Sequence, residues 1–174
     1  MKFYNIEAAK LLLRAKTGIL RRHSAPDMNR LNKYESFDTS LRTLAFESAE
    51  YCLADADTDT SDITHHGIGC VAYCHATSPI RRYADLMNQR ILKCIICGDD
   101  PDNMMITVSV RSLNLRAKAS KQYERDLQFI KAITTGEIFS AIILDIDSVE
   151  KSACKIRVWV PEWGKTISNT YKKV

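Results

Sequence analysis

The chain has 174 residues, of which 45% are hydrophobic and 26% are charged, and its formal net charge is +4 at pH 7. This length allows one to one and a half domains with a real hydrophobic core, and the composition is that of an ordinary soluble globular protein. No apolar run approaches the roughly 18 residues of a membrane span and no secretory leader is recognisable, which predicts a cytoplasmic or nuclear protein with no membrane partner.

The charges are distributed unevenly along the chain. Residues 1–34 carry a net charge of +6, residues 35–62 carry −7, and the remainder carries +5. Basic segments on both sides of an acidic middle fit a protein that binds a polyanion through selected faces.

The N-terminal third is expected to contain two helices and a short strand. Apolar spacing predicts a helix over residues 3–16, which ends at Gly18. A strand at residues 19–20 leads into a basic loop, and Asp27 is placed to cap a second short helix. The loop residues Arg21, Arg22 and His23 can hold phosphates, although a solvated loop explains the same charges equally well.

The middle of the chain predicts a helix, an acidic loop and a strand. Residues 41–53 have the apolar spacing of an amphipathic helix. Alternating Asp residues at 55–62 suggest a calcium loop, but the Gly and Glu that an EF-hand requires at its sixth and twelfth positions are Thr60 and His66, so a solvated loop is the better interpretation. A strand is expected to begin within residues 65–69 and to end at Tyr73.

Residues 75–90, HATSPIRRYADLMNQR, indicate a turn followed by a helix. Thr77 or Ser78 is suited to the N-cap and Pro79 to the first helical position. The expected buried face is Ile80, Tyr83, Ala84, Met87 and Ile91. Free N–H groups at a helix start, two hydroxyls and the paired Arg81 and Arg82 together describe a phosphate site, whereas the alternative is an ordinary Ser-Pro cap with both arginines in water.

The remaining segments complete an α+β fold class. A break at residues 98–102 separates a long helix, expected over 107–133, from strands at 139–147, 155–160 and 166–174. Three strands are too few for a closed barrel, so a small β domain that is cut short is expected.

The six cysteines lie mostly in apolar runs and match no zinc pattern, which favours reduced, packed thiols and no metal.

Three motifs occur in order: ILRRHSAP at residues 19–26, HGIG at 66–69 and HATSPIRRYAD at 75–85. Together with Tyr-Glu-Arg at 123–125 in the long helix, they resemble the exoribonucleases of the ribonuclease II and exosome Dis3 type, over the later part of their catalytic RNB domain. The resemblance extends from about residue 3 to residue 160, although residues 27–62 match only in helical character. The C-terminal strands resemble the first strands of the family's S1 domain, an OB-type RNA-binding barrel.

The resemblance implies hydrolytic, processive removal of nucleotides from the 3′ end of single-stranded RNA. In the family, four Asp carboxylates hold Mg²⁺, and the arginine that matches Arg81 holds the scissile phosphate. Glu124 corresponds to a residue that contacts the 3′-terminal nucleotide. Further RNA contacts are expected, by position and chemistry, at Arg21, Arg22, His23, His75, Thr77, Ser78 and Arg82.

The family's carboxylates lie upstream of the segment that matches residue 1, so no metal ligands are expected in this chain. Nothing in the family places metal at Asp55, Asp57, Asp59 or Asp62. We therefore expect residues 1–133 to be the C-terminal portion of an RNB domain and 134–174 the truncated start of an S1 domain. Two functions stay open: part of an exoribonuclease completed by the missing nuclease portion or exosome-like partners, or a non-catalytic RNA-binding or partner-binding remnant. An unrelated helical domain with a chance Ser-Pro-Ile-Arg-Arg does not explain the order of the matches.

Overall fold

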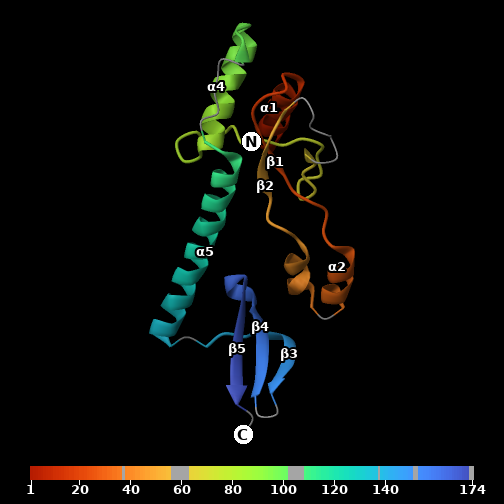
Figure 1. Ribbon diagram of the computed structural model, residues 1–174, viewed down its shortest axis with the longest axis vertical. Coiled ribbons are helices and arrows are strands. Elements are labelled where there is room, and N and C mark those ends of the chain that lie inside the picture. Colours follow the sequence, from red (N-terminus) through yellow and green to blue (C-terminus); the bar gives the residue numbers. More distant parts are fainter. Residues whose placement is uncertain (37, 56–62, 102–107, 137, 151–152, 173–174) are drawn as a thin grey trace. The chain divides into compact units, whose positions relative to one another are not determined.

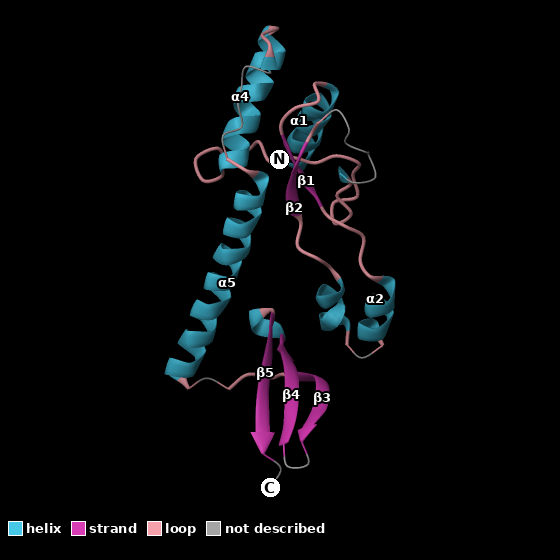
Figure 2. Cartoon of the chain, in the orientation of Figure 1, coloured by secondary structure: helices cyan, strands magenta, loops and turns pink. Residues whose placement is uncertain are grey.

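The computed structural model describes residues 1–36, 38–55, 63–101, 108–136, 138–150 and 153–172 (Figure 1). Their contacts form two compact units, one of residues 1–30 and 45–116 and the other of residues 31–44 and 117–174. Both units contain helix, and each contains one small sheet, which agrees with the expected α+β class (Figure 2). The domain boundary expected at residue 134 stays a prediction.

The first unit is built on two helices and a two-stranded sheet. Its elements are α1 (Lys2–Arg14), β1 (Ile19–Arg22), β2 (Glu50–Leu53), α4 (Tyr83–Cys97) and the first residues of α5 (Val110–Thr135). The expected N-terminal helix and first strand are confirmed. Gly18 joins them at φ +103°, and a Cβ there would lie 2.8 Å from Leu12 Cδ2, so a side chain is excluded on both grounds.

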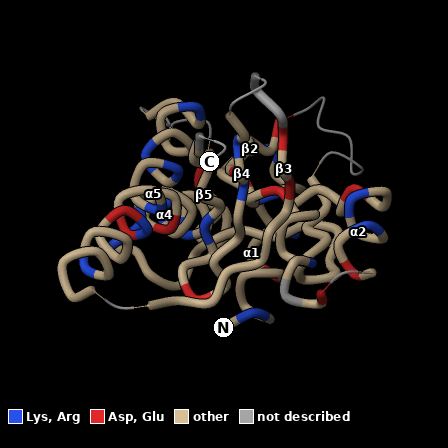
Figure 3. Tube along the Cα trace, turned by 90° about the horizontal axis from the view of Figure 1, so that it is seen from below, with Lys and Arg blue, Asp and Glu red and all other residues tan. Residues whose placement is uncertain are grey.

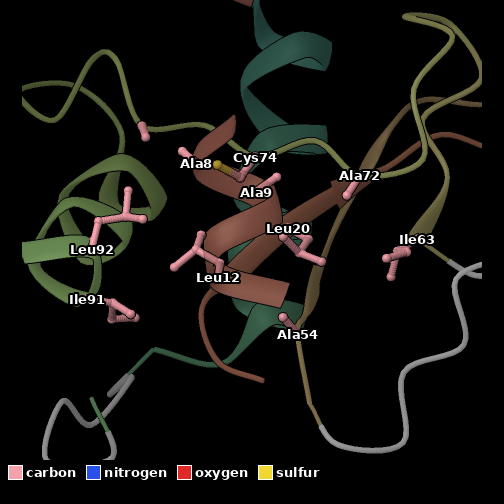
Figure 4. Packing of buried hydrophobic residues seen from close by; sticks show 11 residues of the cluster. Ala8, Ala9, Leu12, Leu20, Ala54, Ile63, Ala72, Cys74, Ile91 and Leu92 are labelled. Carbon is pink, nitrogen blue, oxygen red and sulfur yellow. The ribbon is translucent and has the colours of Figure 1, made fainter. Parts of the chain in front are cut away.

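The core of the first unit lies where α1, β1 and α4 meet (Figure 4). Leu12, Leu20 and Ile91 are all fully buried there, and Leu12 lies between the α4 residues and Leu20. Burial of one such side chain stabilises the fold by about 1.5–3 kcal/mol. Cys74 belongs to the same cluster, and burial raises the pKa of its thiol to about 12, in agreement with a packed, protonated cysteine.

The prediction of a helix over residues 41–53 is wrong. A 3-10 helix, η1 (Thr39–Ala45), occupies its first part, and β2 occupies its last part. β2 pairs antiparallel with β1, with Ile19 opposite Leu53 and Arg22 opposite Glu50. The local apolar spacing suits a helix, but pairing with β1 satisfies the backbone of both segments and therefore decides the outcome.

The strand expected to lead into Tyr73 is also wrong. His65 and Cys70 form an isolated bridge that encloses a turn, and Cys74 forms another bridge with Leu20. Gly69 N–H donates to the carbonyl of His65 at 3.0 Å, which closes the turn. The acidic loop expected at residues 55–62 lies, from residue 56 onward, outside the described residues.

The second unit combines α2 (Met28–Glu35, of which residues 31–35 belong here), η1, the rest of α5 and a three-stranded sheet. The sheet is an antiparallel meander in the order β3 (Ile142–Glu150), β4 (Ala153–Val160) and β5 (Lys165–Lys172). Asp27 Oδ1 accepts hydrogen bonds from the N–H groups of Asn29 and Arg30, so the expected cap of the second helix is confirmed. The described strands form no closed barrel.

One cluster ties α5 to the β4–β5 connection. Lys165 Nζ lies 2.5 Å from Asp126 Oδ1 and 5.0 Å from the centre of the Phe129 ring. The Trp163 ring packs against both Phe129 and Phe139, with ring centres 5.6 and 4.6 Å apart. These contacts hold the sheet on the second half of α5. The sequence predicted the helix and the strands, but not the contacts between them.

Basic and acidic residues both occur along α5 and around α2 (Figure 3). No helix in the described part of the chain combines the length and the apolar character needed to cross a membrane.

Candidate functional site

The segment between Ser78 and Tyr83 is a protruding turn, and α4 begins only after it. The carbonyl of Ser78 accepts hydrogen bonds from the N–H groups of Arg81 (3.3 Å) and Arg82 (3.2 Å). Arg82, in an extended conformation, is the N-cap residue of α4, and it makes no side-chain cap bond. The expected helix start at Pro79 with a hydroxyl cap is therefore wrong. Ile80 is 102% exposed and does not belong to the buried face.

The two adjacent arginines have different environments. Arg82 donates from Nε to Asp85 Oδ2 and from Nη2 to Asp85 Oδ1, both at 2.7 Å. The Arg81 side chain is exposed and makes no hydrogen bond or ion pair within the described residues. The first arginine of the pair is therefore available to an anion, whereas the second is already engaged by a carboxylate.

Asp85 is fully buried and also accepts a hydrogen bond from the Ser78 N–H, at 2.7 Å. Burial by itself raises the pKa of this carboxyl, but the hydrogen bonds from Arg82 and from Ser78 outweigh it and hold the pKa below its ordinary value. Asp85 is thus ionised at neutral pH and joins both ends of the turn.

Amide side chains on α4 fix the backbone around this turn. Asn88 Oδ1 accepts from the Ile19 N–H at 2.8 Å, and its Nδ2 donates to the carbonyls of Ile19 (2.8 Å) and His75 (2.9 Å). Gln89 Nε2 donates to the Ala76 carbonyl at 2.6 Å. Since Asp85, Asn88 and Gln89 all project from α4, this one helix holds the preceding segment at three points.

Two further asparagines act in the same way. Asn114 on α5 accepts from the Tyr51 N–H and donates to the Tyr51 carbonyl, at 2.8 and 3.0 Å. Asn5 on α1 accepts from the Ala76 N–H at 3.2 Å. Each amide replaces a missing strand partner, so the backbone groups stay satisfied without a larger sheet.

A row of aromatic and imidazole rings runs beside the turn. Successive ring centres lie 5.2 to 6.0 Å apart along the series Phe46, His23, His65, Tyr73, His75 and Tyr51. A hydrogen bond of 3.0 Å joins the Tyr51 hydroxyl to His75 Nδ1. The Arg21 guanidinium lies over the Tyr51 ring, 4.8 Å from its centre.

Burial and positive neighbours keep His75 neutral. Burial, followed by the charges of Arg82 and Arg21, lowers the pKa of His75 to about 4. Burial also lowers the pKa of His65, with His23 as the next cause. The pKa of Tyr51 is raised, because burial outweighs the nearby arginines. The structure therefore places a neutral His75 within reach of the charges of Arg21 and Arg82.

The other predicted site residues lie in three different settings. Arg22 faces Glu50 across the sheet at 3.8 Å, with both side chains largely exposed, so this pair is weak. Thr77 is half-buried beside Ser78, and Glu124 is exposed on the part of α5 that belongs to the second unit. Their RNA contacts stay predictions.

His23 has a bridging position that explains the glycine at residue 67. Its Nε2 is 2.8 Å from the Glu47 carbonyl, and its Nδ1 accepts from the Gly67 N–H at 2.9 Å. These partners define the neutral tautomer with the proton on Nε2. A Cβ at residue 67 would lie 2.8 Å from His23 Nδ1.

We therefore expect Gly67→Ala to lower the free energy of unfolding by about 1–3 kcal/mol, because the imidazole must move and lose both partners. Urea unfolding of the variant measures this loss. In a His23→Ala background the clash is absent, and the same substitution should cost much less. Equal costs in the two backgrounds would contradict this explanation.

Sequence reasoning assigned no role to Asp85, Asn88, Asn114, Asn5 or Tyr51. Asp85 and Asn88 lie within residues 75–90, three positions apart on one helix, and this spacing indicates that the two polar side chains share a face. Asn5 and Asn114 contact segments more than 60 residues away, and nothing local indicates those partners.

The described residues do not fit a magnesium site. No group of three or more His, Cys, Asp or Glu side chains that could hold a metal ion occurs among them. Asp85 is fully buried and bound to Arg82 and Ser78. Asp57, Asp59 and Asp62 lie outside the described residues.

Comparison with known proteins defines the class to which this fold and site belong. The family model described as RNB domain matches residues 1–98, which include α1, the small sheet, the turn and α4. The chain therefore belongs to the RNB domain family. The match ends before α5 and the three-stranded sheet, so the S1-like character of the C-terminal strands is not covered by it.

Its relatives include proteins named Exoribonuclease 2. Identity is 34% over 89 residues with that of Aeromonas hydrophila subsp. hydrophila, 35% over 98 residues with that of Shigella flexneri serotype 5b, and 36% over 98 residues with that of Proteus mirabilis. The alignments cover 47% to 52% of this chain but only 13% to 15% of the relatives. The chain thus spans about one seventh of the length of the relatives that it matches.

Proposed function

We propose that this chain is the part of a 3′–5′ exoribonuclease that binds the phosphate backbone of single-stranded RNA, with Arg81 holding the scissile phosphate. The observation that carries the proposal is the unequal environment of the paired arginines. Arg82 is engaged by Asp85, while Arg81 is exposed on a turn held at both ends. The family of the chain and the printed name of its relatives support the choice of RNA as the polyanion.

An arginine suits this role for two physical reasons. Its planar guanidinium grips two phosphate oxygens at once, and its charge stays fixed at all working pH values. It also stabilises the negative charge that develops on the phosphate during hydrolysis. Arg21, whose guanidinium lies 4.8 Å from the centre of the Tyr51 ring, adds positive charge to the same unit.

Hydrolysis in such nucleases uses Mg²⁺, and the described residues do not supply its ligands. The proposal therefore includes a carboxylate-bearing RNB portion, in the same polypeptide or in a second chain. The C-terminal sheet is proposed as the start of an S1-type RNA-binding domain, in keeping with its antiparallel strands and basic residues.

The test is RNA binding and cleavage by the 174-residue chain and by Arg81→Ala. We expect the dissociation constant for 5′-labelled single-stranded RNA to rise about tenfold, since hydrogen bonds to charged groups contribute about 1.5–3 kcal/mol. The slope of log K against log[salt] should fall in magnitude by about 0.7, the value for one phosphate contact on a single strand. Fluorescence anisotropy at several salt concentrations measures both quantities. Any cleavage should disappear in the variant.

Arg90→Ala is the matched control. Arg90 is also an exposed arginine, on α4, and has no partner among the described residues. It should bind RNA as the unchanged chain does, apart from a small general charge effect. Equal affinities for Arg81→Ala and Arg90→Ala would contradict the proposed role of Arg81.

The alternative function is a non-catalytic RNA-binding or partner-binding module, in which the exposed Arg81 binds a phosphate without hydrolysis. A sequencing gel with Mg²⁺ distinguishes the two. A ladder of shortened RNA that Arg81→Ala does not produce supports a nuclease within this chain. Intact RNA together with Arg81-dependent binding favours the binding module or a nuclease completed by another part.

A further inference from the structure

The turn that presents Arg81 is held at its base by one carboxylate. The Asp85 carboxylate accepts from the Ser78 N–H, from Arg82 Nε and from Arg82 Nη2, each at 2.7 Å. We call these three hydrogen bonds the Asp85 clamp. Ser78 precedes the turn and Arg82 ends it, so the clamp joins the two residues between which Arg81 projects.

The exposure of the residues differs sharply between the base and the tip of this turn. Asp85 is fully buried, and the Arg82 side chain is 27% exposed. Ile80 and Arg81, at the tip, are both exposed. The Ser78 carbonyl also accepts from the N–H groups of Arg81 and Arg82, so the backbone on both sides of the tip is bonded. The tip projects into solvent from a rigid base.

We propose that Asp85 is a positioning residue for RNA binding: through the clamp it fixes the turn that presents Arg81 and commits Arg82 to that turn. The inference rests on the proposed function of Arg81 and adds a division of labour within the Arg-Arg pair. Arg81 supplies the phosphate contact. Arg82 has a structural role: its guanidinium binds the Asp85 carboxylate, which largely neutralises its charge.

The physical benefit is preorganisation. A free turn would lose conformational freedom when an arginine at its tip binds a phosphate, and this loss opposes binding. A clamp made before RNA arrives removes that cost. The same arrangement keeps two adjacent guanidinium groups from competing for one phosphate, because one of them already has both oxygens of a carboxylate.

Asp85→Asn gives a test in which two explanations predict opposite signs. The substitution keeps the shape of the side chain, raises the net charge by one and frees Arg82. If charge alone determines RNA affinity, the variant binds more tightly. If the clamp positions Arg81, the variant binds more weakly, by about three- to tenfold, despite the added positive charge.

Arg82→Lys provides a second variant that keeps the charge. Lysine cannot make the two parallel hydrogen bonds, so the connection from residue 82 to Asp85 is weakened while the local charge is preserved. Its affinity should fall in the same direction as that of Asp85→Asn. Unchanged affinity in both variants would overturn the positioning role even if Arg81→Ala binds poorly, in which case the proposed function stands alone.

A double-mutant cycle separates positioning from a general structural effect. In an Arg81→Ala background, Asp85→Asn should no longer weaken RNA binding, because the residue through which it acts is gone. An equal loss in both backgrounds would show that Asp85 does not act through Arg81 and would overturn the inference. If Arg81→Ala itself leaves binding unchanged, the proposed function fails and the inference fails with it.

Met87→Ala is the control for reduced stability. Met87 is buried on the same helix, packs with Ile19 and Ala84, and makes none of the clamp bonds. It should lower the melting temperature at least as much as Asp85→Asn, yet leave RNA affinity within about twofold at a temperature where both proteins are folded. A large loss of affinity in Met87→Ala would attribute the effect of Asp85→Asn to stability and overturn the positioning role.

Discussion

Replacement of Asn88 by alanine is expected to cost about 3–6 kcal/mol of the free energy of unfolding, a large fraction of the stability of a typical domain. Asn88 is fully buried, and its amide satisfies the N–H and the carbonyl of Ile19 and the carbonyl of His75. Alanine leaves these three backbone groups without their partner in the interior, and each such loss costs about 1–3 kcal/mol.

Urea unfolding measures the effect as a fall in the midpoint with little change in the m-value. Gln89→Ala is the matched control, because Gln89 makes a single hydrogen bond to Ala76 and is only half-buried. It should cost about 1 kcal/mol. A loss below that value for Asn88→Ala would show that water or a shift of α4 replaces the amide.

Acidification from pH 6.5 towards pH 4 is expected to destabilise the first unit by about 2–3 kcal/mol through His75. Burial lowers the pKa of His75 from its ordinary 6.5 to about 4. Between these two values the unfolded chain binds a proton at this residue and the folded chain does not. The free energy of unfolding is therefore fully retained above pH 6.5 and falls as the pH is lowered through this window.

The measurement is urea unfolding at several pH values between 4.5 and 7, compared with His75→Gln. The variant should be less stable at pH 7, because it changes the contact with Tyr51, but its stability should depend less steeply on pH. Some dependence should remain from His65, whose pKa is also lowered. The pKa of Asp85 is held below its ordinary value, so Asp85 loses its charge only at lower pH and does not affect this range. Parallel profiles for the two proteins would exclude His75 as the cause.

The arginine pair shows what a motif can and cannot reveal. The Ser-Pro-Ile-Arg-Arg sequence is enough to indicate a phosphate site and a family, and the family is confirmed. The two arginines are nevertheless indistinguishable in sequence. Only the position of Asp85 relative to the turn shows that Arg82 is engaged and Arg81 is available.

The same limit explains the wrong start of α4. Thr77, Ser78 and Pro79 have the local chemistry of a helix start, and most such sequences begin a helix there. Here the Ser78 N–H bonds to the Asp85 carboxylate and the Ser78 carbonyl closes the turn, so the helix begins at Tyr83. The carboxylate of Asp85, seven residues after Ser78 and in the first turn of α4, replaced the local cap.

By itself the sequence determined α1, β1, α2, α4, α5 and the three C-terminal strands, as well as the family, because their apolar periods, caps and motifs are encoded within a few residues. Only the tertiary structure decided that residues 50–53 form a strand, that 65–70 form a turn, and that buried asparagines hold the site together. The reason is physical. Backbone groups in these segments find their partners on elements distant in sequence, and the free energy of satisfying them outweighs local preference.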